Sequence, residues 1–439
     1  MKTVALFFAV LLILSSVIYG IFSLHKPAGN AAATEEEVPA AEWTVLFYMC
    51  GDNNLGDYRQ FETNIHFLQT VGSTDKMNLV VLNDQNKNGD TKAYYIEKRE
   101  DGQALANLTE IPLSEINPAW TDEVDMGDWK SLAAFAEWGF KKYPAKKLNL
   151  FPQNHGGGWI GICWDDTSGT HISVPQLATA MQNITTSLGR KIDVLSMEAC
   201  LMASTEVVYE LYGTCDYYVA CETYGYGAED HGNGNYLIGN WQFDKLYSWL
   251  KENPECSPKE LAKAMVDTFQ EYGPWRSVPY IPKEQSSDCI SAMDVNKVNT
   301  LVEAIDNVSS ALISVLPLQR TRLSAATGVS ESFSGQLDYL GQGTYTLYDL
   351  VDLMINIVRA FPYNSALKTS VETLVLASKE CILWSRCGTD PYAGEHPDAH
   401  GLSIYFPVRG NEYRPSYEDL KFSKDTQWDE VIKAFLIAA

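Results

Sequence analysis

Short apolar runs alternate with segments of helical spacing over the first half of the chain, and this alternation restricts the fold more than any other feature. Residues 43–49 read WTVLFYM and end in a turn-forming cluster, CGDNN. An apolar run of this kind is typical of a strand buried on both faces, as in parallel sheets. Similar runs occupy residues 77–83, 148–153, 193–197 and 217–221.

The segments between these runs have the spacing of amphipathic helices. In residues 129–143, Leu132, Phe135, Ala136 and Phe140 recur on one helical face. Residues 58–70, 177–188 and 203–212 are also predicted to be helices, and residues 91–97 alternate like one arm of a hairpin. The pattern predicts an α/β fold with a mostly parallel sheet and helices on both faces.

The amino-terminal segment is predicted to direct export. Residues 3–24 contain no charged side chain and are preceded by Lys2. As a helix this run would be about 33 Å long, enough to cross a bilayer core of about 30 Å. Residues 31–33 are alanines and offer a cleavage signal, so residues 1–33 are a signal peptide or a membrane anchor. Residues 34–42 are predicted to be an acidic linker.

Charge and cysteine content exclude several classes of protein. The 439 residues carry a net charge of -23, which argues against nucleic acid as a partner. Nine cysteines are too few for a disulfide scaffold, and their odd number leaves at least one thiol unpaired. No pairing can be assigned from the sequence.

Two loops after predicted strands carry the residues of greatest chemical interest. Cys200 follows one strand and is predicted to lie in the first turn of a helix, where partial positive charge favours the thiolate. A lone cysteine there could also be a small core side chain. His155 follows the neighbouring strand and can serve as the base that a cysteine nucleophile needs. The glycines at 156–158 leave N–H groups free to face an oxyanion.

The sequence gives less support for a serine esterase site or a zinc site. A His-Gly-Gly-Gly run also occurs in esterases, but the chain has no G-x-S-x-G elbow to supply a serine. His396 and His400 have the spacing of a zinc site, yet Pro397 interrupts the helix that would place them on one face. We assign no metal site.

Four short motifs in order resemble the clostripain family of cysteine peptidases. They are YMCGDNNL at 48–55, NHGGGW at 154–159, EACLM at 198–202 and GLSIYFP at 401–407. The resemblance implies a caspase-like αβα sandwich with a peptidase core at 43–239. It also implies that the carboxyl-terminal region, 240–439, adds helices and strands to the same fold.

The resemblance also implies roles for individual residues. His155 would be the general base and acid, Cys200 the nucleophile, and the N–H groups of Gly156 and Cys200 the oxyanion donors. Cleavage would follow Arg or Lys, with Glu198 holding the basic side chain. The family commonly has aspartate there, so the preference between Arg and Lys stays open. Glu198 could equally accept bonds from a helix start.

The loop after residue 221 offers further acidic candidates. Glu222, Glu229 and Asp230 are either a second carboxylate of the basic-residue pocket or solvated loop acids. No cofactor is required for the dyad; calcium binding by this loop stays open, because its acids lack an ordered D-x-D-x-D-G spacing.

The sequence thus predicts an exported, monomeric cysteine endopeptidase that acts on proteins or peptides. Residues 156–189 contain no lysine or arginine, so we expect a single chain that is not cut by itself in this loop. The alternative is a surface-anchored binding protein that kept the fold without turnover.

Overall fold

A computed structural model describes residues 41–57, 59–99, 108–225, 228–229, 237–238, 241–269, 288–336, 344–387, 389–390 and 394–437. The chain divides into Met1–Pro39 and Ala40–Ala439, and the described residues all belong to the second unit. The predicted export segment and most of the linker lie outside the described residues. Among the described residues, no helix is both long and apolar enough to cross a membrane.

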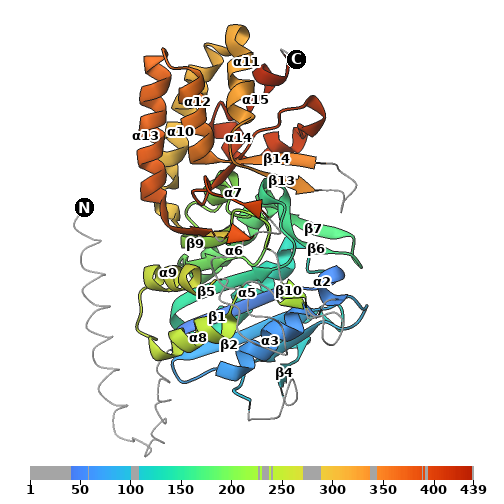
Figure 1. Cartoon of the computed structure of the whole chain (residues 1–439). Coiled ribbons are helices and arrows are strands. Elements are labelled where there is room, and N and C mark those ends of the chain that lie inside the picture. Colours follow the sequence, from blue (N-terminus) through green and yellow to red (C-terminus); the bar gives the residue numbers. More distant parts are fainter. Residues whose placement is uncertain are drawn as a thin grey trace, which may run out of the picture. The chain divides into compact units, whose positions relative to one another are not determined.

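A nine-stranded sheet is the centre of the fold (Figure 1). Its order is β15-β12-β9-β8-β5-β1-β2-β3-β4, and the five strands from β9 to β2 are parallel. The strands are β1 (Ala41–Cys50), β2 (Met77–Asp84), β3 (Lys92–Tyr95), β4 (Thr109–Ile111), β5 (Ala145–Gln153), β8 (Ile192–Ser196), β9 (Cys215–Cys221), β12 (Cys289–Asp294) and β15 (Ile382–Cys387).

Helices cover both faces of this sheet, as the alternation predicted. The side chains of β1 show why: Val45, Phe47 and Met49 belong to one apolar core, and Leu46 and Tyr48 belong to the other. The first core is closed by α3 (Gln60–Val71), α8 (Phe243–Glu252) and α9 (Pro258–Thr268). The second is closed by α5 (Trp129–Lys142), α6 (Val174–Leu188), α7 (Thr205–Glu210), α10 (Val298–Ile313), α12 (Leu350–Ala360), α13 (Ser365–Cys381) and α15 (Trp428–Ile437).

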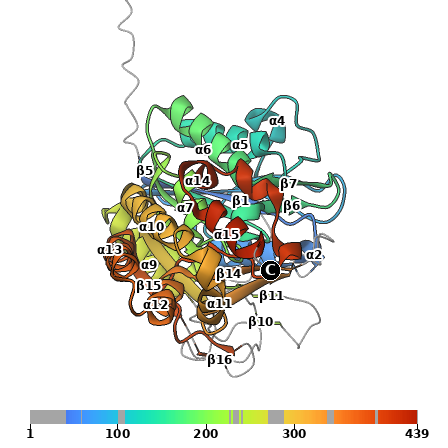
Figure 2. The same ribbon diagram turned by 90° about the horizontal axis from the view of Figure 1, so that it is seen from above.

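The carboxyl-terminal region adds to the main sheet and also builds its own layer. β12 and β15 join the sheet antiparallel to β9, while α10, α12, α13 and α15 gather with α11 (Leu316–Thr327) at one end (Figures 1 and 2).

The remaining helices are α2 (Asn54–Asp57), α4 (Leu113–Ile116) and α14 (Lys421–Asp425). The smaller sheets pair β6 (Gly161–Asp165) with β7 (Thr170–Ser173), β10 (Ala228–Glu229) with β11 (Leu237–Ile238), and β16 (Thr389–Asp390) with β17 (Gly394–Glu395). A three-stranded sheet joins β13 (Ser332–Gln336), β14 (Thr344–Asp349) and β18 (Ser403–Tyr405).

One predicted helix is partly wrong. The apolar spacing of residues 346–360 predicts a single helix, but the first part is strand β14 and α12 begins at Leu350. Asp349 decides this boundary, because its carboxylate accepts a hydrogen bond from the Asp352 N–H at 2.7 Å and caps the helix.

One disulfide joins the edge of the sheet. Cys289 on β12 and Cys387 on β15 are bonded across an antiparallel pair, and the other seven cysteines are free. The bond closes a loop with a sequence separation of 98 residues. A loop of this size predicts a contribution of about 2–5 kcal/mol to the free energy of unfolding.

We therefore expect Cys387→Ser to lower the free energy of unfolding by about 2–5 kcal/mol in urea titrations under non-reducing conditions. Cys256→Ser, which changes a free thiol, serves as the control. Thiol titration of the denatured wild-type chain should find seven free thiols. A count of nine would contradict the bond.

Candidate active site

Two loops leave the carboxyl ends of the neighbouring parallel strands β5 and β8 and begin side by side. Gln153, the last residue of β5, forms a parallel bridge with Glu198. The Asn154 N–H donates to the Glu198 carbonyl oxygen at 3.1 Å. Ligands and reacting groups of α/β proteins collect at this edge of the sheet. The fold thus brings together the loops that carry His155 and Cys200.

Gly156 lies against the backbone of the cysteine loop. A Cβ atom at this position would be 2.2 Å from the Cys200 carbonyl oxygen and 2.9 Å from the Ala199 Cβ. The absence of a side chain is therefore what allows the two loops to touch. The N–H of Cys200 lies near its own sulfur and helps to stabilise the charged form of the thiol.

The His155 ring is held by an asparagine from the loop after β1. Its Nε2 lies 2.6 Å from the Asn54 Oδ1. Because an amide oxygen accepts, Nε2 carries the proton in this arrangement and Nδ1 has the basic lone pair. Burial lowers the pKa of His155 to about 4. The ring is therefore neutral near pH 7 and able to take a proton.

The sequence pattern does not identify Asn54 as a positioning residue, because the residue belongs to the turn-forming cluster after the first predicted strand. Because β1 is parallel to β5, its carboxyl end lies at the same edge of the sheet as the His155 loop. The position of Asn54 after a predicted parallel strand is the feature of the sequence that could have identified it as a site residue.

The prediction that Cys200 lies in the first turn of a helix is wrong, so a helix start does not account for its reactivity. It lies in a turn in which Leu201 has a φ of 64°, and α7 begins only at Thr205. Ser204 caps that helix, since its side chain accepts from the Val207 N–H. The helix start is thus too far along the chain to stabilise a thiolate at Cys200.

The surroundings of Cys200 favour a neutral thiol. The side chain is half-buried and unpaired, and the Gly225 N–H donates to its sulfur at 3.3 Å. Burial raises the pKa of Cys200 to about 11, while the Gly225 hydrogen bond lowers it in part. A base must therefore remove the thiol proton when the cysteine reacts.

Glu198 is buried beneath the cysteine loop and is held by helix α3. The Gln60 Nε2 donates to one carboxylate oxygen at 3.0 Å, and the Asn64 Nδ2 donates to the other at 2.9 Å. Both donors are side-chain amides, so the predicted bonds from helix-start N–H groups are not what holds this carboxylate. Burial raises the pKa of Glu198 to about 8, although both amide bonds lower it.

The three other acidic candidates are placed differently. Glu222 is fully buried; its Oε2 accepts from the Gly401 N–H at 2.8 Å. Burial and the adjacent Asp349 carboxylate raise its pKa well above the usual range. This placement indicates a structural role for Glu222. Asp230 and the side chain of Glu229 lie outside the described residues, as does most of the loop considered for calcium.

The two histidines considered for zinc face separate acidic partners. The Nδ1 of His396 lies 2.8 Å from a carboxylate oxygen of Glu331, and the Nδ1 of His400 lies 3.0 Å from Asp349. Each imidazole thus contacts a carboxylate of its own.

Over most of its length the chain is similar to known cysteine peptidases. The model of the clostripain family matches residues 47–435. Clostripain from Hathewaya histolytica is 23% identical over 428 residues, which cover 86% of this chain and 77% of clostripain.

Two crystal structures show the same fold. One is a secreted C11 cysteine protease from Bacteroides thetaiotaomicron in complex with an irreversible peptide inhibitor, with a TM-score of 0.57 and 19% identity, covering 90% of this chain and 99% of the other. The second is an inactive zymogen C11 protease from Parabacteroides distasonis, with a TM-score of 0.58 and 18% identity, covering 88% and 98%. The family match over nearly the whole described chain, together with the fold, shows that this protein is a cysteine endopeptidase of the clostripain family.

Proposed function

We propose that the chain is an exported endopeptidase that cleaves after Arg or Lys through a dyad of Cys200 and His155. The observation that carries this proposal is the meeting of the two loops at the ends of β5 and β8, with a neutral imidazole in one and a free thiol in the other. A buried carboxylate, Glu198, comes two residues before the thiol.

The reaction follows from these groups. His155 takes the thiol proton as the Cys200 sulfur attacks the carbonyl carbon of the substrate. The N–H groups of Gly156 and Cys200 stabilise the oxyanion. The tetrahedral intermediate collapses, the C–N bond breaks, and His155 gives its proton to the leaving amine. Water, deprotonated by His155, then hydrolyses the thioester, and the proton returns to the sulfur.

Glu198 supports a preference for a basic P1 residue. At a pKa of about 8 the carboxyl is largely protonated at neutral pH when no cation is near. An arriving guanidinium or ammonium group would stabilise the charged form and replace one of the amide partners. The buried position would make that ion pair stronger than one on the surface.

Three features support export and attachment outside the cytoplasm. Residues 3–24 form an uncharged run that is long enough for a signal peptide or an anchor. The Cys289–Cys387 bond is typical of an oxidising compartment. One of the solved relatives is described as secreted. We further propose that the exported enzyme is a monomer. We also propose that it does not cut itself in residues 156–189, because this loop contains no basic residue.

The pH dependence of cleavage tests the specificity proposal. With substrates that carry Arg or Lys at P1, we expect kcat/KM to rise through about pH 8 as Glu198 ionises. In Glu198→Gln this rise should be absent and kcat/KM should fall about 10–100-fold, mainly through KM. His155 and Cys200 titrate outside this window, near 4 and 11, so the rise belongs to Glu198.

Glu210→Gln is the matched control, because burial also raises the pKa of Glu210, which lies on α7. The pH dependence of kcat/KM in this variant should match that of the wild type. Substrates with Asp and Asn at P1 complete the panel. Efficient cleavage after Asp, or a Glu198→Gln profile like that of the wild type, would contradict the basic-residue pocket.

A further inference from the structure

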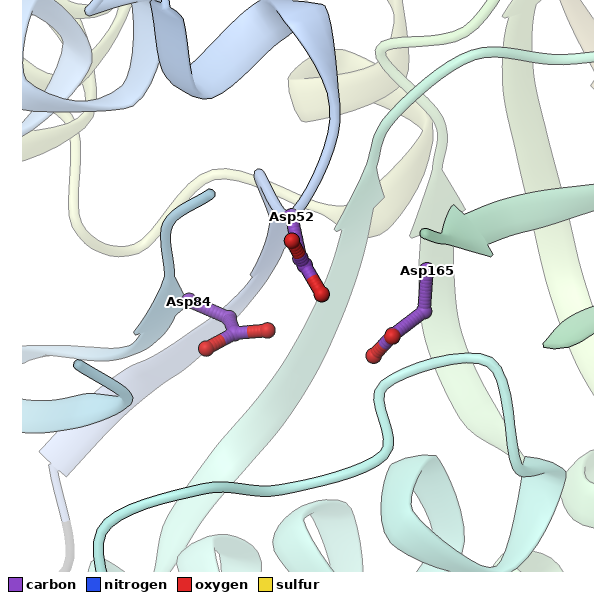
Figure 3. A group of neighbouring side chains, drawn as sticks. All are labelled: Asp52, Asp84 and Asp165. Atoms are coloured by element: carbon purple, nitrogen blue, oxygen red, sulfur yellow. The ribbon is translucent and has the colours of Figure 1, made fainter. Parts of the chain in front are cut away.

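Three buried carboxylates from distant parts of the chain meet beside the candidate active site. Asp52 follows β1, Asp84 ends β2 and Asp165 ends β6. Each offers an oxygen within 4.8 Å of the others, and each is at most 2% exposed. Figure 3 shows the three side chains turned toward a common centre. We call Asp52, Asp84 and Asp165 the acidic cluster.

One oxygen of the acidic cluster has no partner. The Oδ1 of Asp84 accepts from the Thr91 hydroxyl at 2.6 Å, but Oδ2 is buried with no hydrogen-bond partner among the described residues. The ion pairs of the described residues include none of the three carboxylates. A buried, unpaired carboxylate oxygen is costly, and a bound cation would remove that cost.

The other oxygens are fixed by backbone donors. Asp52 accepts from the Thr167 N–H at 2.8 Å. Asp165 accepts from the N–H groups of Ser168 and Met126, each at 2.8 Å. These bonds hold the carboxylates in place without neutralising their charge. Such support from outside the ligand shell is typical of metal sites.

The spacing and the chemistry of the donors agree on a class of ligand. Carboxylate oxygens are the ligands of hard cations such as Ca²⁺ and Mg²⁺. The three ligand atoms all lie within 4.8 Å of one another, close enough to contact a single ion whose bonds to oxygen are about 2.4 Å long. A second group, formed by Asp84, Asp90 and Glu123, adjoins the first and adds negative charge.

We propose that the acidic cluster binds a hard divalent cation. Asp84 supplies the unpartnered oxygen, and Asp52 and Asp165 supply the other two carboxylates.

The cation would position His155 through the loop that follows Asp52. The Asn53 Nδ2 donates to the Trp164 carbonyl oxygen at 2.8 Å, which ties this loop to the residue before Asp165. The next residue, Asn54, holds the His155 ring. Asn54 is thus a positioning residue two places from a ligand of the cation. This effect on catalysis rests on the proposed function, whereas cation binding does not.

Calorimetry on the full chain tests the site directly. The chain is treated with a chelator, moved to chelator-free buffer and titrated with Ca²⁺ and, separately, Mg²⁺. We expect one saturable site and a melting temperature that rises with cation concentration. Asp84→Asn should weaken binding at least tenfold. Asp166→Asn, which removes an equal charge at the exposed neighbouring position, should bind like the wild type.

No binding of either cation by the wild-type chain would overturn the site. Unchanged affinity in Asp84→Asn would overturn it as well. If that variant does not fold, Asp52→Asn takes its place, and the wild-type titration stands by itself.

Activity assays keep the two proposals apart. Cys200→Ala should bind the cation like the wild type although it cannot cleave. A chain that binds the cation but cleaves no Arg or Lys substrate would contradict the proposed function and leave the site intact. Equal kcat with and without bound cation would contradict the proposal that the cation positions His155.

Discussion

Cys200→Ala should lower kcat/KM by at least about 10⁴-fold on every substrate that the wild-type chain cleaves. The loss follows because the sulfur forms the covalent bond to the substrate and no other group can replace it. The half-buried site accepts the smaller side chain, so the melting temperature should change little. Steady-state rates, with active-site titration by a thiol-reactive peptide, measure the effect.

Cys256→Ala provides a close control. Cys256 is also a half-buried free thiol, and burial raises its pKa to about 11, as at Cys200. The two thiols therefore differ in position and not in intrinsic acidity. We expect Cys256→Ala to keep wild-type activity. Activity that survives Cys200→Ala would remove the assignment of the nucleophile.

Gly156→Ala should lower kcat by about 10²-fold or more while the chain still folds. The added methyl group would lie 2.2 Å from the Cys200 carbonyl oxygen, so the two loops must move apart. A displacement of about 1 Å at reacting groups is enough for a loss of this size. The expected destabilisation is about 1–3 kcal/mol. Pre-steady-state kinetics of acylation measure the effect on kcat, and circular dichroism confirms folding.

Gly410→Ala separates this steric effect from a general effect of glycine replacement. A Cβ atom at Gly410 would meet nothing within 4 Å. That variant should keep both its activity and its stability. If Gly156→Ala also kept wild-type kcat, close contact between the histidine and cysteine loops would not be needed for the reaction.

Most of the central sheet could be predicted from the sequence. Residues 43–49, 148–153 and 193–197 lie in β1, β5 and β8 or directly at their ends. These strands are buried on both faces, so they must be apolar along their length, and a local pattern is enough to identify them. The family resemblance, carried by short motifs in the loops, was confirmed by the family match.

The environment of the site could not be predicted in the same way. The helix after Cys200 begins at Thr205 because Ser204 caps it, so the expected help from a helix start is absent. Asn54 and Gln60 contact His155 and Glu198 across 101 and 138 residues of sequence. No local pattern encodes such contacts, because they depend on which strand ends share an edge of the sheet.

The sequence by itself determined the order of strands and helices, the two loops that carry His155 and Cys200, and the family. Those properties follow from hydrophobic periodicity and from short motifs, which are local. Only the tertiary structure decided how these groups are charged and held: a neutral thiol, a buried Glu198 bonded to α3, and three aspartates gathered around one centre. The physical reason is that burial and charge interactions act through space, between residues far apart in the chain.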